Sequence, residues 1–290
     1  MKWSKYPITK ITLEHKNYPK ILKKIKKPPP ILYCRGPLNN NIFTKSLAVV
    51  GSRRITHYGR MAAEKIIPAL AADKVTIISG FMYGVDSEAH RICLENGGLT
   101  VAVLGGGLDV IYPPENEKLY EQILKCDGAI VSEYPPDFKP QLWTFPQRNR
   151  IVAGLSCLGV LIIEAGEKSG SLITARFARE QGKKIFAVPG PITSSVSIGT
   201  NYLLQNHQAK MVLGAEDILG KKMEKLTLFS TANLTPLEKK IVQLLEAEPL
   251  TADEIGVKTE QKAIEVNQTL SLLSLKGLIL EFAGKYCLNA

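Results

Sequence analysis

The sequence lacks any apolar run approaching the about 18 residues that a membrane-spanning helix needs. Its first residues also lack the apolar segment of a secretory signal peptide. The five cysteines are scattered along the chain without a CxxC pair, a pattern that favours reduced thiols over a disulfide framework or a zinc site. We therefore expect a cytoplasmic protein that is not inserted in a membrane.

The motifs of several enzyme classes are also missing. No GxGxxG with an acidic residue about 20 positions later, no GxxxxGK[ST] loop and no GxSxG nucleophile turn is present. Asp86 and His90 are four residues apart on one helical face, but no third ligand follows in metal-binding spacing, which favours a helix-stabilising pair. Glu164 is the best lone acid–base candidate, and a lone carboxylate is more typical of a structural partner. The sequence predicts no catalytic residue, metal or cofactor.

Acidic residues are nearly absent from the start of the chain. Residues 1–46 contain 11 lysines and arginines and a single acid, Glu14, whereas the complete chain contains 37 basic and 27 acidic residues. The net charge of +10 is therefore concentrated in this segment. Such a basic arm is typical of nucleic-acid contact and equally of a solvated segment without a partner, and charge alone leaves both interpretations open.

The 290 residues, of which 45% are hydrophobic, are sufficient for two domains with a sizeable core. Short β-branched runs predict strands at 47–51, 75–79, 100–104, 129–132, 158–163, 185–188 and 210–213. Helical patterns lie between them, at about 56–72, 86–96, 115–125, 147–156, 171–181 and 200–207. Strands without alternation, each followed by a helix, indicate a doubly wound, mostly parallel Rossmann-like α/β sheet over 47–219, preceded by the basic arm and lead-in segment 1–46.

A polar linker at 220–233 and a small domain at 234–290 complete the predicted organisation. Thr235–Glu238 and Thr251–Glu254 have the pattern of capping boxes, a third helix is expected at about 260–276, and Leu278–Leu288 alternates like a hairpin. Three helices and a hairpin predict a winged helix. The third helix carries two lysines and two glutamates among leucine, serine and glutamine, which favours contact with protein, although DNA contact stays an alternative.

Three turns rich in small residues follow predicted strands: Gly51–Arg54, Ser79–Asp86 and Ser169–Thr174. The carboxyl ends of parallel strands meet at one edge of a sheet, where ligands bind. Glycine and serine expose backbone N–H groups, a helix N-terminus adds partial positive charge, and arginine offers paired donors to phosphate. Each turn alone is equally typical of a tight strand-to-helix connection with a serine cap. Together, the three turns predict an anion site.

A fourth segment, Phe145–Arg150, places an aromatic ring and two arginines before the helix that leads into the fifth strand. Phosphate pairing by arginine and base stacking on phenylalanine are typical of proteins that bind single-stranded nucleic acid without sequence preference. In the alternative interpretation, Phe145 belongs to the core and one arginine pairs with Glu133 or Glu164.

These motifs closely resemble those of the DprA/Smf family, the DNA-processing proteins of natural transformation. The resemblance is carried by GSR at 51–53, SGFMYGVDSEAH at 79–90, GGGLDVIYPPEN at 105–116, FPQRNRIVAGLS at 145–156 and EAGEKSGSLITA at 164–175. It implies a cytosolic, non-enzymatic recombination mediator. Such a protein binds and protects incoming single-stranded DNA, displaces or bypasses single-strand binding protein, loads the RecA recombinase and acts as a homodimer through the Rossmann-like domain.

The resemblance also implies a DNA pocket. Its residues are expected here at Ser52, Arg53, Gly80, Phe81, Phe145, Arg148, Asn149, Arg150, Ser169, Gly170 and Ser171. Arg54 is added to this expectation because it shares the turn of Arg53.

Two other classes of function are weighed against this one. A phosphoribohydrolase-like nucleotide-processing enzyme also places Gly/Ser-rich phosphate turns on a Rossmann-like sheet, but Pro189-Gly190-Pro191 is not followed by the glutamate that its motif needs. A transcription regulator would read DNA with its winged helix, which the neutral charge of the 260–276 helix disfavours.

Overall fold

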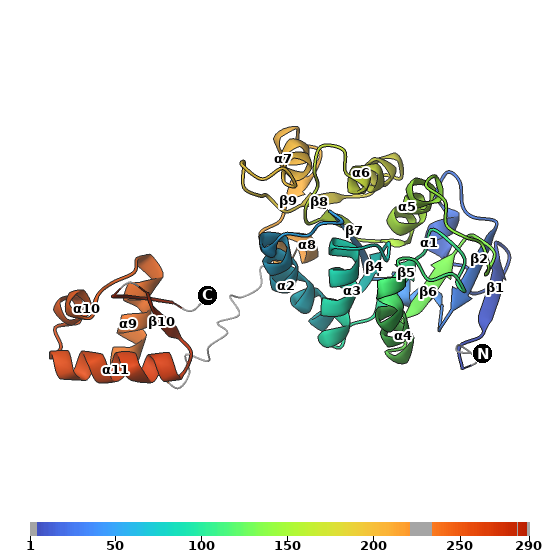
Figure 1. The fold of residues 1–290 in the computed structure, drawn as a ribbon. Coiled ribbons are helices and arrows are strands. Elements are labelled where there is room, and N and C mark those ends of the chain that lie inside the picture. The colour runs from blue at the N-terminus through green and yellow to red at the C-terminus, as the bar shows by residue number, and fades with distance from the viewer. Residues whose placement is uncertain (1–4, 221–233, 283, 289–290) are drawn as a thin grey trace. The chain divides into compact units, whose positions relative to one another are not determined.

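The computed structural model describes residues 5–220, 234–282 and 284–288. The chain divides into two compact units, residues 1–221 and 222–290, shown in Figure 1. Among the described residues, no helix is long and apolar enough to cross a membrane.

The first unit is built on a sheet of nine strands in the order β1-β2-β6-β5-β4-β3-β7-β8-β9. Their bounds are β1 (Ile8–Thr12), β2 (Ile31–Arg35), β3 (Ser46–Val50), β4 (Thr76–Ser79), β5 (Thr100–Val103), β6 (Ala129–Ser132), β7 (Gly159–Ile162), β8 (Ile185–Ala187) and β9 (Lys210–Met211). The pairings from β6 to β9 are parallel, and every residue of β3 to β8 is buried. Burial on both faces explains why these strands are continuous apolar runs in the sequence.

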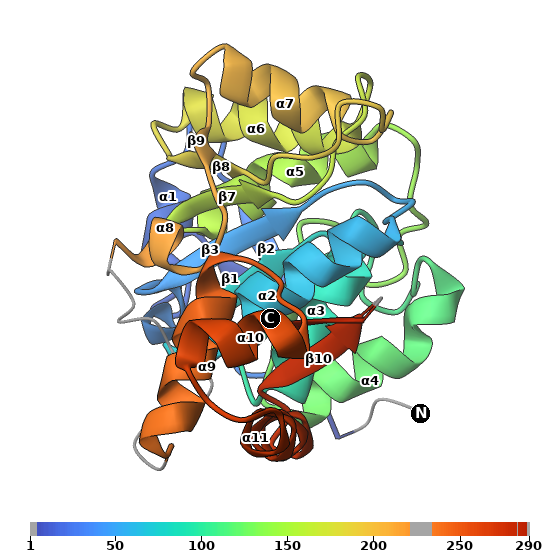
Figure 2. The ribbon, with the colours of Figure 1, turned by 90° about the vertical axis from the view of Figure 1, so that its left-hand side faces the viewer.

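Helices cover both faces of this sheet, which confirms the predicted doubly wound α/β class. The bounds are α1 (Lys20–Lys23), α2 (His57–Ala72), α3 (Val85–Glu95), α4 (Glu117–Lys125), α5 (Thr144–Leu155), α6 (Gly170–Glu180), α7 (Ile198–Gln205) and α8 (Glu216–Leu219). Short 3-10 turns lie at Asn40–Phe43 and Pro114–Asn116. Figure 2 shows α5, α6 and α7 on one side of the sheet and α2, α3 and α4 on the other. The buried side chains form one cluster on the α5 face and two on the opposite face.

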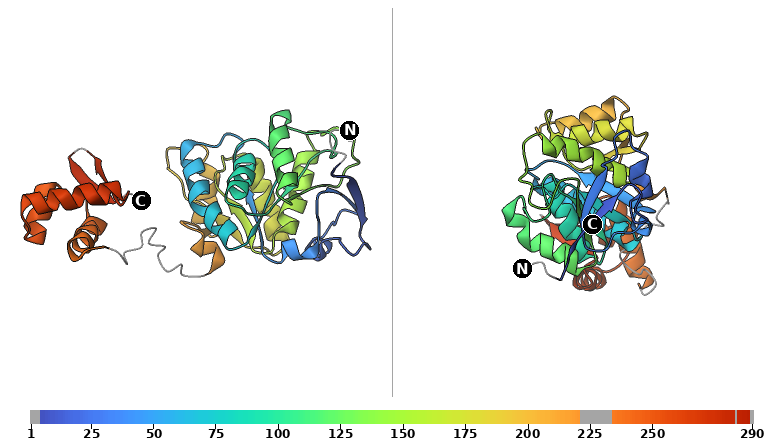
Figure 3. Two further views of the ribbon diagram at one scale, coloured as in Figure 1. Left: turned by 90° about the horizontal axis from the view of Figure 1, so that it is seen from below. Right: turned by 90° about the vertical axis from the view of Figure 1, so that its right-hand side faces the viewer.

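Residues 5–46, the described part of the segment expected as a basic arm and lead-in, pack with this domain and contribute two strands that were not predicted. β2 pairs antiparallel with β6, and β1 pairs antiparallel with β2 and forms the outer edge of the sheet (blue in Figure 3). Tyr18, Leu22 and Leu32 are fully buried, and the Tyr18 hydroxyl donates to the carbonyl of Pro29 at 2.8 Å. The apolar side chains between the lysines therefore decide where this segment lies, while the lysines extend into solvent.

The second unit contains three helices and a hairpin, as predicted for a winged helix. The bounds are α9 (Pro236–Ala247), α10 (Ala252–Thr259), α11 (Ala263–Leu275), β10 (Ile279–Phe282) and β11 (Lys285–Leu288). Both capping boxes are formed, at Thr235 with Glu238 and at Thr251 with Glu254. The third helix begins at 263, because Glu260 adopts a left-handed conformation that ends α10. The expected linker lies, after Gly220, outside the described residues.

Candidate functional site

A cleft of about 550 Å³ opens at the carboxyl ends of β3, β4 and β7. β3 and β7 are neighbours, and the chain leaves them toward opposite sides of the sheet, so the cleft lies at a topological switch point. Ten of the predicted site residues line it: Ser52, Arg53, Arg54, Gly80, Phe145, Arg148, Asn149, Ser169, Gly170 and Ser171. The sheet topology therefore brings together four segments that are distant in the sequence.

The turn after β3 presents two arginines at the rim of the cleft. The Ser52 hydroxyl accepts from the Arg54 N–H at 3.0 Å and closes the turn. The carbonyl of Ser52 accepts from the N–H of Val85 at 3.0 Å, which ties the turn to the start of α3. Arg53 and Arg54 are both exposed. The turn is thus fixed by its backbone, while its two guanidinium groups remain accessible.

The turn before α6 supplies the opposite wall. The Ser169 hydroxyl caps the helix by accepting from the N–H of Ser171 at 3.4 Å, and the two serine hydroxyls are 2.7 Å apart. The N-terminus of this 11-residue helix faces the cleft and adds partial positive charge. Lys168, which also lines the cleft, was not predicted, although it stands beside Ser169 in the sequence.

Phe145 lies in the first turn of α5 and is half-buried. The guanidinium carbon of Arg53 is 5.7 Å from the centre of its ring. Two further groups adjoin the ring: Gly105, where a Cβ would stand 2.8 Å from it, and the ring of Tyr112, at 5.5 Å between centroids. An aromatic face and a cation therefore meet inside the cleft.

Arg148 closes the floor of the cleft. Its side chain is buried and its guanidinium donates to the carbonyls of Gly80 and Val103, at the ends of β4 and β5. Burial lowers the pKa of Arg148 to about 10, so the group stays charged at neutral pH. Burial also raises the pKa of Asp86, against the opposing effect of Arg148. Arg148 thus contributes positive charge to the cleft from a fixed position.

The packing at the floor of the cleft leaves no room for a side chain at Gly80. A Cβ at Gly80 would lie 2.6 Å from Oδ2 of Asp86 and 2.7 Å from Nη2 of Arg148. Both side chains therefore lie directly over the Gly80 backbone.

Phe81 and Arg150 lie away from the cleft, which corrects their predicted assignment to the DNA pocket. Phe81 is fully buried, and its ring packs edge-on against Tyr120 at 6.0 Å. Arg150 makes a two-pronged ion pair with Glu133, at 2.8 and 2.6 Å, and both side chains are largely buried. The alternative in which one of the two arginines pairs with Glu133 is therefore correct for Arg150.

The two lone candidates for acid–base or metal chemistry have structural partners. Glu164 is buried and accepts from the N–H of Thr56 at 3.0 Å and from its hydroxyl, at the N-terminus of α2, where a carboxylate is favourable. His90 Nδ1 is 2.6 Å from the Thr100 hydroxyl. Within the described part of the chain, no group of three or more potential metal ligands is found.

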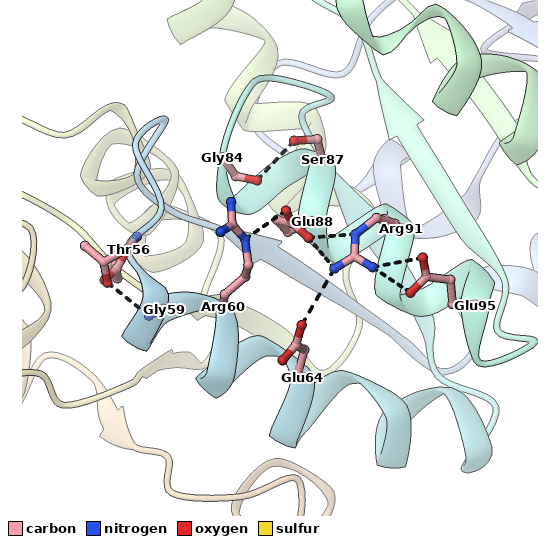
Figure 4. Close-up of polar contacts among 10 residues, drawn as sticks. Thr56, Gly59, Arg60, Glu64, Gly84, Ser87, Glu88, Arg91 and Glu95 are labelled. Carbon is pink, nitrogen blue, oxygen red and sulfur yellow. Dashed lines mark hydrogen bonds and ion pairs between the residues drawn. The ribbon is translucent and has the colours of Figure 1, made fainter.

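A surface network of ion pairs joins α2 to α3 beside the cleft (Figure 4). Glu88 forms ion pairs with Arg60 at 3.1 Å and with Arg91 at 2.6 Å, and Arg91 also pairs with Glu95 at 2.6 Å. These charges compensate one another. By contrast, Arg53, Arg54 and Lys168 form no ion pair with the described residues, and their charge is available to an external anion.

Family models match both units of the chain. The model for DNA recombination-mediator protein A matches residues 9–222, and the model for the DprA winged helix domain matches residues 229–285. The chain belongs to the DprA family of DNA recombination mediators. This assignment favours DNA processing over the nucleotide-processing and regulatory alternatives.

Individual relatives support the same assignment. The chain is 35% identical to Protein Smf of Synechocystis sp. over 313 residues, covering 94% of this chain and 78% of the relative. It is 43% identical to DNA processing protein DprA of Streptococcus pneumoniae over 204 residues, covering 70% and 71% of the two chains.

Solved structures of the family have the same fold. The X-ray structure of DprA from Streptococcus pneumoniae has a TM-score of 0.68 and 40% identity, covering 76% of this chain and 75% of that one. DNA processing protein A from Helicobacter pylori has a TM-score of 0.66 and 33% identity, covering 74% of this chain and 95% of that one. The latter structure concerns the single-stranded DNA binding mode of that protein.

Proposed function

We propose that the chain binds single-stranded DNA in the cleft between β3 and β7 and acts as a recombination mediator in natural transformation. The observation that carries this proposal is the placement of Arg53 over the ring of Phe145, inside a cleft whose rim cations are unpaired within the described residues. Membership of the DprA family supports the same conclusion.

The phosphates are held by charge and by backbone donors. Arg53, Arg54 and Lys168 provide mobile cations, Arg148 provides a fixed one, and the α6 N-terminus adds N–H donors. Phosphate contacts of this kind carry no base information, so we expect binding to depend little on sequence.

The bases are held by stacking. Phe145 is half-buried within the cleft, so a base must leave a duplex to reach its ring. Base–aromatic stacking tolerates every base, because each has a π-face. Stacking on a ring that only an unpaired base can reach selects single strands over duplex DNA.

The same geometry supports positioning of DNA without chemical change. Glu164 and Asp86, two carboxyl groups beside the cleft turns, are buried and already engaged by Thr56 and Met82. Protection of incoming DNA, displacement of single-strand binding protein and loading of RecA follow as the roles of a mediator that presents the strand it holds.

We infer that the protein acts as a homodimer through the edge of the sheet at β9. Exposed apolar side chains gather in this part of the chain, with Tyr202 55%, Met211 49% and Leu213 61% exposed. A second copy covering this edge would also pair its free backbone groups. Leu213→Lys should then shift the protein from dimer to monomer in analytical ultracentrifugation, and a wild type that sediments as a monomer would contradict the inference.

The test of DNA binding is fluorescence anisotropy with labelled oligo-dT and with duplex DNA of equal length, at two salt concentrations. We expect the wild type to prefer oligo-dT, to bind less tightly at higher salt and to lose this binding in the Arg53→Ala/Phe145→Ala double variant. Arg176→Ala is the matched control, because Arg176 is an exposed arginine of α6 that does not line the cleft. Duplex preference, or equal binding by the double variant, would overturn the proposal.

Mediator activity requires a separate assay. RecA filament formation on DNA coated with single-strand binding protein should be accelerated by the wild type and not by the double variant. Equal rates with and without the protein would show that strand binding does not lead to RecA loading.

A further inference from the structure

Tyr112 is an exposed aromatic residue just outside the cleft. It lies in the loop after β5 and its side chain is 42% exposed. Its ring centroid is 5.5 Å from that of Phe145, with 42° between the ring planes, yet it does not line the cleft. The two rings therefore form a continuous aromatic surface that begins in the cleft and continues onto the carboxyl edge of the sheet.

The groups around the Phe145 ring indicate a direction for a DNA strand along this edge of the sheet. Arg53, which lines the cleft, and Tyr112, which does not, both adjoin the Phe145 ring. The 5.5 Å between the ring centroids exceeds the 3.4 Å rise of one strand in duplex DNA, so successive bases of a partly extended strand fit on the two rings. A strand whose phosphates are fixed in the cleft is thereby directed toward β5.

The charge beyond Tyr112 excludes a phosphate-binding role for this edge. Tyr83 donates to the carboxylate of Glu115 at 2.6 Å, and this hydrogen bond lowers the pKa of Glu115. Glu115 follows Tyr112 in the same loop, and an ionised carboxylate there repels phosphate. The contribution of Tyr112 must therefore come from stacking on a base, without a phosphate contact.

We propose that Tyr112 is a second base-stacking position for single-stranded DNA, continuing the strand from Phe145 along the carboxyl edge of the sheet. The proposal rests on the proposed function of the cleft and adds the direction in which the strand leaves it. It also separates two groups of residues: the cations of the cleft fix phosphates, and the rings of Phe145 and Tyr112 hold bases.

The first experiment compares oligo-dT of about four nucleotides with oligo-dT of about 12 nucleotides, lengths that bracket the site sizes of single-strand binding folds. Tyr112→Ala should weaken binding of the longer oligonucleotide about fivefold or more, the lower end of the range for one base–aromatic stack, and that of the shorter one less than twofold. Tyr112→Phe should restore wild-type binding, because it keeps the ring.

The matched control is Trp143→Leu. Trp143 is 54% exposed on the same edge, but its ring adjoins those of Tyr134 and Phe138 instead of Phe145. We expect Trp143→Leu to bind both oligonucleotides like the wild type. An equal loss in Trp143→Leu and Tyr112→Ala would show that stacking is spread over the edge and would overturn the assignment to Tyr112.

A second measurement changes the DNA instead of the protein. Single abasic sites are placed at each position of the longer oligonucleotide, which removes a base and keeps its phosphate. At one position the loss caused by Tyr112→Ala should disappear, because the two changes remove the same contact. A loss that persists at every abasic position would refute stacking even if Tyr112→Ala also disturbed the loop.

The salt dependence distinguishes this inference from the proposed function. Tyr112→Ala should leave the slope of log Kd against log salt unchanged, whereas Arg53→Ala should reduce it by about one unit. If Arg53→Ala weakens binding and Tyr112→Ala does not, the stacking position is wrong and the cleft assignment stands. If the wild type shows no preference for single strands, both fail.

Discussion

The guanidinium carbon of Arg53 lies 5.7 Å from the ring centre of Phe145, although Arg53 follows β3 and Phe145 lies in the first turn of α5. A planar guanidinium can lie on a ring and still offer paired donors to a phosphate, whereas an ammonium is a point charge. We therefore expect Arg53→Lys to weaken binding of oligo-dT about two- to fivefold, the worth of an exposed cation–π contact.

The salt dependence provides the control for this variant. Arg53→Lys keeps the charge and should keep the wild-type salt slope, while Arg53→Ala should lose affinity further and bind with a shallower slope. Anisotropy titrations at several salt concentrations measure both quantities. Equal affinity of Arg53→Lys and the wild type would show that charge alone accounts for the role of Arg53.

Gly80 supports the floor of the cleft through the absence of a side chain. Gly80→Ala places a Cβ within 2.7 Å of both Asp86 and Arg148, whose side chains must then move. Overpacking of this kind costs about 1–3 kcal/mol of unfolding free energy. We expect this loss in urea denaturation, together with weaker binding of oligo-dT because Arg148 is displaced.

Gly170→Ala is the matched control for stability. A Cβ at Gly170 would meet no atom within 4 Å, and the residue opens α6. Its unfolding free energy should stay within about 0.5 kcal/mol of the wild type. A Gly80→Ala variant as stable as Gly170→Ala would show that Asp86 and Arg148 relax without cost.

The sheet and the position of the cleft were predictable because they rest on strong sequence signals. Residues such as Leu47 to Val50 form a continuous apolar run, which a strand buried on both faces requires. The turns after β3 and before α6 were expected to meet, because the carboxyl ends of parallel strands lie on one edge. β1 and β2 were missed, since dense lysines concealed their few buried side chains, such as Ile11 and Leu32.

The direction of individual side chains could not be predicted from the sequence. Arg148 and Arg150 are two residues apart on α5, so they point about 200° apart around the helix axis and only one can face the cleft. The position of Glu133 decides which of the two arginines faces the cleft, and that position depends on the tertiary fold. Phe81 adopts a backbone φ of 62°, which carries its ring into the core while the adjacent Gly80 lines the cleft.

The Arg150–Glu133 pair should contribute to the stability of the fold and not to DNA binding. The two side chains are 12% and 9% exposed and pair at 2.6 Å, so Arg150→Met leaves Glu133 largely buried without its partner. We expect a loss of about 3–5 kcal/mol in unfolding free energy. The Glu133→Gln/Arg150→Met variant should recover much of it, because no uncompensated charge remains.

DNA binding separates this prediction from the earlier assignment of Arg150 to the pocket. At a temperature where the double variant is folded, its affinity for oligo-dT should equal that of the wild type. A reduced affinity with a shallower salt slope would show that Arg150 contacts phosphate after all.

His90 makes the stability of the first unit sensitive to acid. Its Nδ1 donates to the Thr100 hydroxyl, because that hydroxyl itself donates to the carbonyl of Ile77 at 2.8 Å, and Nε2 is buried without a hydrogen-bond partner among the described residues. Burial, with a smaller effect of the Arg148 charge, lowers the pKa of His90 to about 3. The neutral ring is therefore the form that the fold accepts.

The pH dependence follows from the difference between the two states. The unfolded chain takes up a proton at His90 near its ordinary pKa of about 6.5, whereas the folded chain does so only near 3. The stability from this group is complete above pH 6.5 and falls as the pH drops toward 3, by at most about 1.4 kcal/mol per pH unit. His90→Asn keeps a donor for Thr100 and cannot titrate. Urea denaturation between pH 4.5 and 7.5 should show the wild type losing stability faster than this variant as the pH falls. The carboxyl groups are the same in both proteins, so their contribution cancels in the difference. Parallel curves would mean that His90 is protonated inside the fold without cost.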